Sequence, residues 1–240
     1  MNLAVCVKSC HKHLDEGYHE AIRGTWARDL KALGVETYFF VGTDPSQQDT
    51  RRCRRYVSNE VVVDCKDDYE SLPVKTRRIC QWTMGKTFER IFLCDTDTLI
   101  KAKELLATGF EAFDYAGYFG KEGTSPGCAP FSYTDAYGTY PECRAWASGG
   151  VGYFLSRRAA EIIAATPPTY WAEDLQVGQT LAPEFDTKRM IGSAMNMGNG
   201  VVTSHFVKTN GTPEYKPEYM KLAYELGSFE NLYRKGKLVA

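Results

Sequence analysis

The sequence contains no long hydrophobic run: nothing in its 240 residues approaches the roughly 20 consecutive apolar residues that a membrane-spanning helix needs. The apolar run at its start, residues 1–7, has no basic leader and ends at Lys8, so it is more typical of a core strand than of a signal peptide. We therefore expect the chain as given to be soluble and cytoplasmic. A membrane anchor removed from a longer protein would leave no trace in it.

An excess of charge of either sign is also missing. The 29 basic and 30 acidic residues give a net charge of -1 and a pI near 6.4, so no overall field favours nucleic acid. One short basic run, Arg51, Arg52, Arg54 and Arg55, could attract an anionic acceptor, but acids such as Asp49 offset it and favour a solvated face. Because no stripe interleaves basic with aromatic residues, we expect no nucleic-acid partner.

Closely paired cysteines, repeats and linkers are absent as well. Eight cysteines occur, but no two are spaced as Cys-x-x-Cys, which argues against a structural zinc site. Several lie in apolar segments, where cysteine usually behaves as a small buried hydrophobe, so we expect reduced thiols. With 43% hydrophobic residues and no low-complexity tract, the sequence predicts a single domain over residues 1–240.

What the sequence does contain is an alternation of strand and helix signals. Ile22, Trp26, Leu30 and Leu33 recur at helical spacing, whereas residues 35–41 are rich in β-branched and aromatic side chains. We expect strands at 3–7, 35–41, 61–63, 91–93 and 153–155, and helices at 17–33, 73–85 and 157–165. Such alternation indicates parallel strands in an α/β sheet.

Residues 119–147 lack this order. They are rich in glycine, proline, serine and tyrosine and show little periodicity, which predicts a long loop. Long loops in compact domains often bind substrates or close over them, and the alternative is an inert excursion of the surface.

Asp95 and Asp97 are the sharpest chemical signal. They follow an apolar segment, and alternate residues of an extended chain point the same way, so both acids can face one site. Ligands of open α/β sheets sit at the carboxyl ends of strands, where two hard oxygen ligands suit Mg²⁺ or Mn²⁺. Alone, an Asp-x-Asp pair is a weak motif that is more typical of turns and helix caps than of a metal site, so its context must decide.

Two further segments carry candidate groups. Glu173 and Asp174 could begin a helix, since acids favour the first turn, or a buried acid there could serve as a general base. His205 stands alone between apolar residues, a setting more typical of a structural histidine, yet imidazole also binds Mn²⁺. His11 and His13 follow the first strand, but their spacing supports no specific role.

Six blocks of sequence follow one another in a recognisable order. They are Ile22-Arg23-Gly24-Thr25-Trp26, then Tyr38-Phe39-Phe40-Val41-Gly42, then Asp64, Asp67, Tyr69, Leu72, Lys75 and Thr76 in one spaced block, then Asp95-Thr96-Asp97, then Ser148-Gly149-Gly150-Val151-Gly152, and finally Glu173-Asp174-Leu175. The series resembles the β-1,3-glycosyltransferases of glycosyltransferase family 31, which include the fringe and core 1 galactosyltransferase types.

The resemblance implies a GT-A fold, a single α/β/α sandwich around a mostly parallel, Rossmann-like sheet. It implies inverting transfer of a sugar from a UDP-sugar donor to an acceptor hydroxyl on a carbohydrate or glycoconjugate. It also implies Mn²⁺ or Mg²⁺ held by Asp95, Asp97 and His205, with Asp174 as the catalytic base. Donor contacts are expected from the residues that match the family's motifs: Arg23, Asp67, Lys75, Asp95, Thr96, Ser148, Gly149 and Gly150. Helix packing is the alternative role for Arg23 and Lys75.

Some positions depart from the family's pattern. Thr96 replaces the usual middle aspartate, His19 stands where many members have arginine, and the sequence shows no Golgi-type anchor, which suggests a bacterial or viral relative. Two other functions stay open: a retaining GT-A transferase, and a catalytically silent nucleotide-sugar or carbohydrate-binding module. We expect residues 119–147 and the tyrosine-rich tail from Thr212 to select the acceptor.

Overall fold

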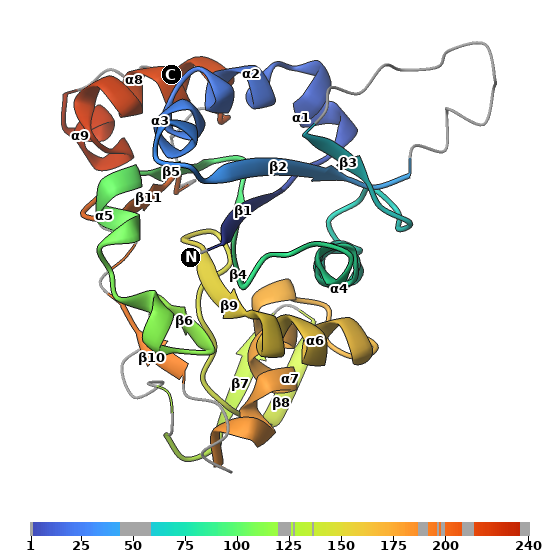
Figure 1. The fold of residues 1–240 in the computed structure, drawn as a ribbon. Coiled ribbons are helices and arrows are strands. Elements are labelled where there is room, and N and C mark those ends of the chain that lie inside the picture. The colour runs from blue at the N-terminus through green and yellow to red at the C-terminus, as the bar shows by residue number, and fades with distance from the viewer. Residues whose placement is uncertain are drawn as a thin grey trace.

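A seven-stranded sheet runs through the molecule in the order β3-β2-β1-β4-β9-β6-β10 (Figure 1). The structure is a computed structural model that describes residues 2–43, 59–119, 126, 128–135, 137–186, 192–195, 197, 200–207 and 214–235. The strands of the sheet are β1 (Leu3–Lys8), β2 (Glu36–Val41), β3 (Glu60–Val62), β4 (Arg90–Asp95), β6 (Tyr115–Gly117), β9 (Tyr153–Ser156) and β10 (Gly192–Ala194). Two antiparallel pairs lie outside it: β5 (Thr98–Ile100) with β11 (Thr203–His205), and β7 (Phe131–Asp135) with β8 (Gly138–Cys143).

The sheet is mixed but mostly parallel. β1 pairs in parallel with both β2 and β4, β2 with β3, and β6 with β10, whereas β9 runs antiparallel to β4 and β6. In the register of β1 and β4, Lys8 lies opposite Asp95. The carboxyl ends of these two central strands therefore meet at one edge of the sheet, the edge where ligands of such sheets sit.

Helices cover both faces of the sheet (Figure 1). One layer contains α2 (Tyr18–Arg23), α3 (Trp26–Ala32), α5 (Ala102–Leu106), the 3₁₀ turn η2 (Phe110–Ala112), α8 (Pro217–Leu226) and α9 (Phe229–Arg234). The other contains α4 (Leu72–Met84), α6 (Arg157–Ala165) and α7 (Glu173–Asp186). The short helix α1 (His11–Asp15) follows β1 directly.

The two layers follow from the two-residue period of the strands. Leu3, Val5 and Val7 of β1 pack into the cluster on the α3 side, while Ala4 and Cys6 pack into the cluster on the α4 side. All five side chains are buried, because a central strand covered on both faces must be apolar throughout. A continuous apolar run at the start of the chain is therefore what this position in the sheet requires.

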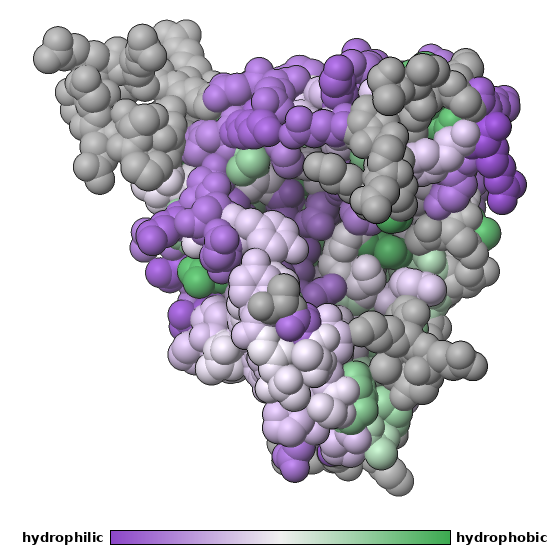
Figure 2. All heavy atoms as spheres, turned by 180° about the vertical axis from the view of Figure 1, so that it is seen from behind, coloured by the Kyte–Doolittle hydropathy of each residue, from purple (hydrophilic) through white to green (hydrophobic). Residues whose placement is uncertain are grey.

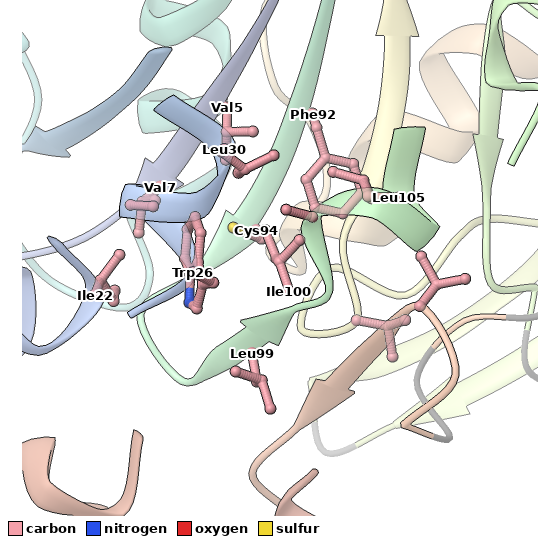
Figure 3. Close-up of a cluster of buried hydrophobic side chains, with 14 of the residues drawn as sticks. Val5, Val7, Ile22, Trp26, Leu30, Phe92, Cys94, Leu99, Ile100 and Leu105 are labelled. Carbon is pink, nitrogen blue, oxygen red and sulfur yellow. The ribbon is translucent and has the colours of Figure 1, made fainter. Parts of the chain in front are cut away.

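Figure 3 shows the α3-side cluster, in which helix and strand side chains meet at close range. Leu30 of α3 lies beside Val5 of β1, Trp26 of α3 lies beside Cys94 of β4, and all four are fully buried. Burying a side chain of this size stabilises the fold by about 1.5–3 kcal/mol relative to leaving it exposed. This packing fixes β1 and β4 side by side, and with them the residues at their ends.

The helix expected over 17–33 is in fact two helices, α2 and α3. The break falls at Gly24 and Thr25, where the Thr25 hydroxyl donates to the carbonyl oxygen of Ala21 at 2.8 Å and so takes part in ending α2. The prediction that Leu33 belongs to the buried face was wrong, since its side chain is 44% exposed. It follows α3, beyond the last turn that faces the sheet.

Residues 119–147 were predicted to be a loop, and for residues 131–135 and 138–143 that was wrong. They contain the hairpin β7–β8, in which Tyr133 pairs with Tyr140 across the strands. The composition hid the hairpin because its strands are short and it joins no other sheet. The strand expected at 61–63 is also less buried than predicted: it is the edge strand β3, and Val62 is 43% exposed.

Other sequence predictions were confirmed. α4 begins beside Pro73 and ends before Gly85, and α6 begins after Ser156, whose hydroxyl accepts a hydrogen bond from the Ala159 amide at 3.2 Å. The described cysteines are all unpaired. The basic run at 51–55 lies outside the described residues.

One face of the molecule is mostly polar where the structure describes it (Figure 2). On the face shown in Figure 2, hydrophobic side chains appear as small separate patches among hydrophilic ones. In the part of the chain that the structure describes, none of the helices has the length and hydrophobicity needed to span a membrane.

Candidate functional site

Asp95, Asp97 and His205 come together at the carboxyl end of β4. Asp95 is the last residue of β4, and the chain turns through Asp97 into β5. β11 pairs with β5 so that His205 lies opposite Thr98, which brings the imidazole to the two acids. One ligand atom from each of the three residues lies within 4.8 Å of the others, and His205 Nε2 is 3.2 Å from Asp97 Oδ1. Two oxygens and one nitrogen in this arrangement could hold a divalent cation.

The charges of the cluster shift each other's ionisation. Desolvation at this position raises the pKa of Asp95 to about 6; the Lys8 ammonium opposes this rise and Asp97 adds to it. Burial would lower the pKa of His205, but the neighbouring Asp97 carboxylate outweighs it and the pKa is raised. The raised pKa of Asp95 beside a second carboxylate indicates a site with an unbalanced negative charge, which a cation would relieve.

Lys8 and Glu173 form a second layer beside the cluster. Lys8 Nζ lies 3.3 Å from Asp95 Oδ1 and 2.7 Å from Glu173 Oε2, and both the Lys8 and Glu173 side chains are buried. Burial would lower the pKa of Lys8, yet the carboxylates of Asp95 and Glu173 raise it above its ordinary value. The lysine therefore stays charged and links the end of β1 to β4 and to the first turn of α7.

Glu173 is fully engaged in structural hydrogen bonds. Its Oε1 accepts from the Thr76 hydroxyl at 2.7 Å and from the Tyr153 hydroxyl, and its Oε2 accepts from Lys8. A buried carboxylate with three donors from α4, β9 and β1 serves as a joint between these elements. Of the two acids named by the sequence, Glu173 is the one whose surroundings favour a structural role.

Asp174 has different surroundings. Its Oδ2 accepts from the Gly149 amide at 3.2 Å and its Oδ1 from the Leu175 amide at 2.8 Å, so backbone groups alone orient it in the bonds found here. Its side chain is half-buried. Desolvation and the nearby Glu173 carboxylate raise the pKa of Asp174 above the usual value for an aspartate. A carboxylate that is held in place and made more basic is suited to accept a proton.

The glycines of the 148–152 segment are required by close contacts. A Cβ at Gly149 would lie 2.8 Å from Glu173 Oε2, and one at Gly150 would lie 2.6 Å from the His205 ring. Gly152 has a positive φ of 92°, a conformation that favours glycine. The segment therefore passes between the candidate metal ligands and the acidic start of α7, and Ser148 anchors it by donating its amide to Tyr118 O at 2.9 Å.

A cavity of about 320 Å³ opens beside the cluster. Its walls include both acids of the cluster with Lys8, Thr96, His13, Tyr69, Asp67, Lys75 and Tyr215. The Thr96 hydroxyl is hydrogen-bonded to His13 Nδ1 at 2.8 Å, and the His13 ring stacks on Tyr18. The position where the family usually has a middle aspartate is thus occupied by a neutral pair at the cavity wall.

Asp67 and Lys75 line the cavity and bind each other. Lys75 Nζ lies 2.7 Å from Asp67 Oδ1 and also donates to the Ser9 carbonyl oxygen. Asp67 accepts from the backbone amides of His11 at 2.5 Å and Gly42 at 2.6 Å. The pair therefore ties together the segments that follow β1 and β2, and this packing role coexists with the predicted donor contact.

Arg23 is not brought to the cluster. Its guanidinium donates to Glu60 Oε1 at 2.7 Å and to Asn59 Oδ1 at 3.0 Å, and it lines a separate surface pocket. His19 is buried in the same network, between Ser9 Oγ at 2.7 Å and Glu60 Oε1 at 3.1 Å. The predicted contact of Arg23 with the nucleotide stays a prediction, and the packing alternative accounts for every bond described for it.

Lys8 and Tyr153 are functional candidates that the sequence reasoning missed, and His13, for which it supported no specific role, lines the cavity. A charged residue at the end of an otherwise apolar strand was the available signal for Lys8, because a strand buried on both faces tolerates a charge only where it is paired. The partners of Lys8 lie 87 and 165 residues away along the chain, so no local pattern could identify them. Of the tail aromatics, Tyr215 lines the cavity, while Tyr219 and Phe229 pack on Phe206.

The comparisons with known proteins identify the family. A family model described as galactosyltransferase matches residues 18–190, a span that includes α2, the Asp95–Asp97 turn and the start of α7. The chain belongs to the galactosyltransferase family. The membership of glycosyltransferase family 31 expected from the six blocks is thereby confirmed, and the protein is a glycosyltransferase.

The remaining comparisons are less informative. No curated protein matches the sequence. Among solved structures, the inositol-1-phosphate CTP transferase from T. maritima is similar over 92% of this chain and 95% of its own, with 13% identity and a TM-score of 0.43. A similarity at this level gives no information about the reaction that the present protein catalyses.

Proposed function

We propose that this transferase moves a sugar from a UDP-sugar to an acceptor hydroxyl with inversion at the anomeric carbon, on a GT-A fold, and that it depends on Mn²⁺ or Mg²⁺. One observation carries the proposal: Asp95, Asp97 and His205 converge within 4.8 Å at the end of a central strand, beside a cavity, in a member of the galactosyltransferase family.

The donor set fits the proposed cation. Carboxylate oxygens suit both Mg²⁺ and Mn²⁺, and an added imidazole nitrogen favours Mn²⁺. A cation bound there supplies the positive charge that a diphosphate leaving group requires as it departs. The raised pKa of Asp95 supports this assignment, because the site as described carries more negative charge than its surroundings neutralise.

Lys8 contributes a fixed positive charge beside this site. Its contacts with Asp95 and Glu173 balance two carboxylates that would otherwise repel each other and the diphosphate. Because Lys8 is fixed between strand and helix, it also orients Asp95 toward its position in the cluster. Its role in the proposal is to position and balance the acids.

The cavity supports a nucleotide-sugar as donor. Its volume of about 320 Å³ is in the range of small-molecule pockets, which are roughly 300–1,000 Å³. We assign its donor contacts to the residues that line it or border the cluster, namely Asp67, Lys75, Thr96, Ser148, Gly149 and Gly150. The close approach of the Gly149–Gly150 backbone to Glu173 and His205 leaves that backbone beside the reacting groups.

Asp174 completes the proposed mechanism as the base. An acceptor hydroxyl is a weak nucleophile near neutral pH, so a carboxylate must take its proton as the oxygen attacks the anomeric carbon. The amides of Gly149 and Leu175 hold the Asp174 carboxylate in place, and its raised pKa increases its proton affinity. Attack from the face opposite to the departing diphosphate gives inversion, which the anomeric configuration of the product reports.

Calorimetry of UDP binding tests the proposal. We expect UDP to bind in the presence of Mn²⁺ and not with a chelator, and Asp95→Asn or Asp97→Asn to abolish binding. Asp68→Asn is the matched control, because Asp68 lines the same cavity but is exposed and accepts a hydrogen bond from the Ser71 amide instead. Equal UDP affinity with and without the cation would rule out the metal role. Loss of UDP binding in Asp68→Asn would show that removing any negative charge from the cavity abolishes binding, so the loss in the Asp95 and Asp97 variants would not indicate a metal ligand.

A further inference from the structure

Three aromatic side chains from separate segments gather next to the start of α7. They are Tyr69 before α4, Tyr137 in the turn of the β7–β8 hairpin, and Trp171 before α7, and we call them the aromatic shelf. The rings of Tyr137 and Trp171 are stacked with centroids 3.7 Å apart and planes at 29°. Tyr69 approaches Trp171 at 6.3 Å with planes at 45°.

The shelf is exposed to an extent that packing does not explain. Tyr69 is 64% exposed and Tyr137 is 57% exposed, although both are large rings. Neighbouring exposed rings are uncommon unless they meet a ligand or partner. In Figure 2 the lower part of the face, where the β7–β8 hairpin lies, is pale, as expected for a surface of tyrosine, tryptophan and small residues.

One carboxylate holds the shelf in shape. Asp135 Oδ2 accepts from the Trp171 indole nitrogen at 3.1 Å, while its Oδ1 accepts from the amides of Tyr137 at 2.8 Å and Gly138 at 3.1 Å. Asp135 thus fixes the hairpin turn and the indole together. Rings fixed before binding lose little conformational entropy when a ligand packs on them.

The shelf lies between two parts of the candidate site. Trp171 is separated from Asp174 by Ala172 and Glu173, and Tyr69 lines the cavity that contains Asp95 and Lys8. Partial desolvation raises the pKa of Tyr69, and the charges of Asp174 and Asp95 add to this rise. A ligand seated on the shelf therefore lies beside the candidate base and next to the mouth of the donor cavity.

We propose that the aromatic shelf binds the acceptor, and that the acceptor presents a pyranose ring to it. A pyranose has a face of C–H groups that packs on aromatic rings and a rim of hydroxyls that polar side chains recognise. The Asp174 carboxylate can accept a hydrogen bond from such a hydroxyl, and it lies on the side of the shelf where the proposed sugar transfer must occur. This assignment rests on the proposed function, since Asp174 is its reference point.

The position of the shelf favours a sugar over the uracil of the donor as its ligand. The proposed donor diphosphate belongs at the Asp95–Asp97 cluster, and the cavity beside it is lined also by Thr96, His13 and Asp67, with Tyr69 as the one shelf residue among its lining residues. The shelf extends instead along the start of α7, on the Asp174 side. If the uracil ring of the donor lay on the shelf, the donor cavity would be left without a nucleotide.

Titration of the full-length protein with methyl glycosides tests the proposal. The probes are methyl β-galactoside, methyl β-glucoside and methyl β-N-acetylglucosaminide, and the signal is the indole N–H resonance of Trp171, assigned with Trp171→Phe. We expect at least one glycoside to move this resonance in a saturable way, and Tyr69→Ala or Tyr137→Ala to weaken that glycoside about three- to tenfold. Tyr224→Ala is the matched control. Tyr224 is half-buried, its hydroxyl donates a hydrogen bond to Asp29, and it lies far from the shelf.

The outcomes separate this proposal from the function on which it rests. If UDP binds with Mn²⁺ but no glycoside moves the Trp171 resonance, the shelf assignment is wrong and the donor site stands. If a glycoside binds the shelf but UDP does not bind, the shelf is a carbohydrate site in a protein without donor binding. A resonance that moves equally in the wild type and in both tyrosine variants would place the sugar elsewhere and overturn the proposal.

Discussion

Lys8 and Glu173 form a buried ion pair that joins the central strand β1 to the first turn of α7 across 165 residues of sequence, with Nζ and Oε2 2.7 Å apart. The pair places Asp174, the next residue, beside the glycine segment, and it places a positive charge against Asp95. The geometry of the candidate base and that of the candidate metal ligands thus depend on the same contact.

From this pair we predict that Glu173 and Asp174 have different roles: Glu173 stabilises the fold, and Asp174 serves turnover. We expect Glu173→Gln to lower the free energy of unfolding by about 3 kcal/mol, because it leaves the buried Lys8 charge with Asp95 as its remaining carboxylate partner. Urea unfolding followed by circular dichroism measures this loss. Glu161→Gln is the control: Glu161 is 55% exposed and pairs with Arg157 on the surface of α6, so its change should cost less than about 1 kcal/mol. A stable Glu173→Gln protein that has lost turnover would instead make Glu173 the base.

Much of the fold could be predicted from the sequence because its signals are local. The apolar run of β1, the proline and glycine that bound α4, and Ser156 at the start of α6 each act within a few residues. The division of 17–33 into two helices was not readable from hydrophobic spacing, since Ile22, Trp26 and Leu30 keep their burial across the break at Thr25. The hydrogen bond from the Thr25 hydroxyl to the preceding turn helps to end α2, and hydrophobic spacing carries no information about it.

The candidate site could be predicted in part for the same reason. Asp95, Asp97 and Asp174 belong to short motifs, and the sequence places each at the start or end of an expected element. The Lys8–Glu173 pair, the bond of Thr96 to His13 and the aromatic shelf connect segments far apart in the chain. They arise from the parallel alignment of β1 with β4 and from the position of the β7–β8 hairpin, which only the folded chain defines.

Gly150 offers a test of the metal site that leaves every proposed ligand intact. In Gly150→Ala the new Cβ would lie 2.6 Å from the His205 ring, so we expect the imidazole to leave its present position beside Asp97. We expect the affinity for Mn²⁺ in the presence of UDP to fall about 10- to 100-fold, as for other changes that displace a ligand indirectly. Calorimetry measures it, and Gly85→Ala serves as control because its Cβ meets the Trp82 carbonyl oxygen at an ordinary 3.6 Å. Unchanged Mn²⁺ affinity in a folded Gly150→Ala protein would remove His205 from the metal shell.

His19 predicts a pH dependence of stability. Burial lowers the pKa of His19 below its ordinary 6.5, although its bond to Glu60 opposes this, and Arg23 and Glu20 are the other charges near it. A histidine whose pKa is lower in the folded state is protonated more readily when unfolded, so the stability is complete above pH 6.5 and falls as the pH drops below it. We expect the melting temperature to fall less steeply in His19→Gln than in the wild type between about pH 6.5 and 5. Parallel curves for the two proteins would contradict this.

Asp174→Asn tests the base by its effect on rate and on pH dependence together. The substitution keeps an oxygen that can accept from the Gly149 amide, so the fold and the affinity for UDP should change little. Turnover with an acceptor should fall by about 10²–10⁴, the usual contribution of a general base. In the wild type, turnover should rise with pH as Asp174 loses its proton and then level off. This rise should lie at higher pH than for an ordinary aspartate, because desolvation and Glu173 raise the pKa of Asp174. The residual turnover of the variant should lack the rise. If Asp174 only helps to begin α7, Asn would replace it well, and near wild-type turnover with an unchanged pH profile would show that the base lies elsewhere.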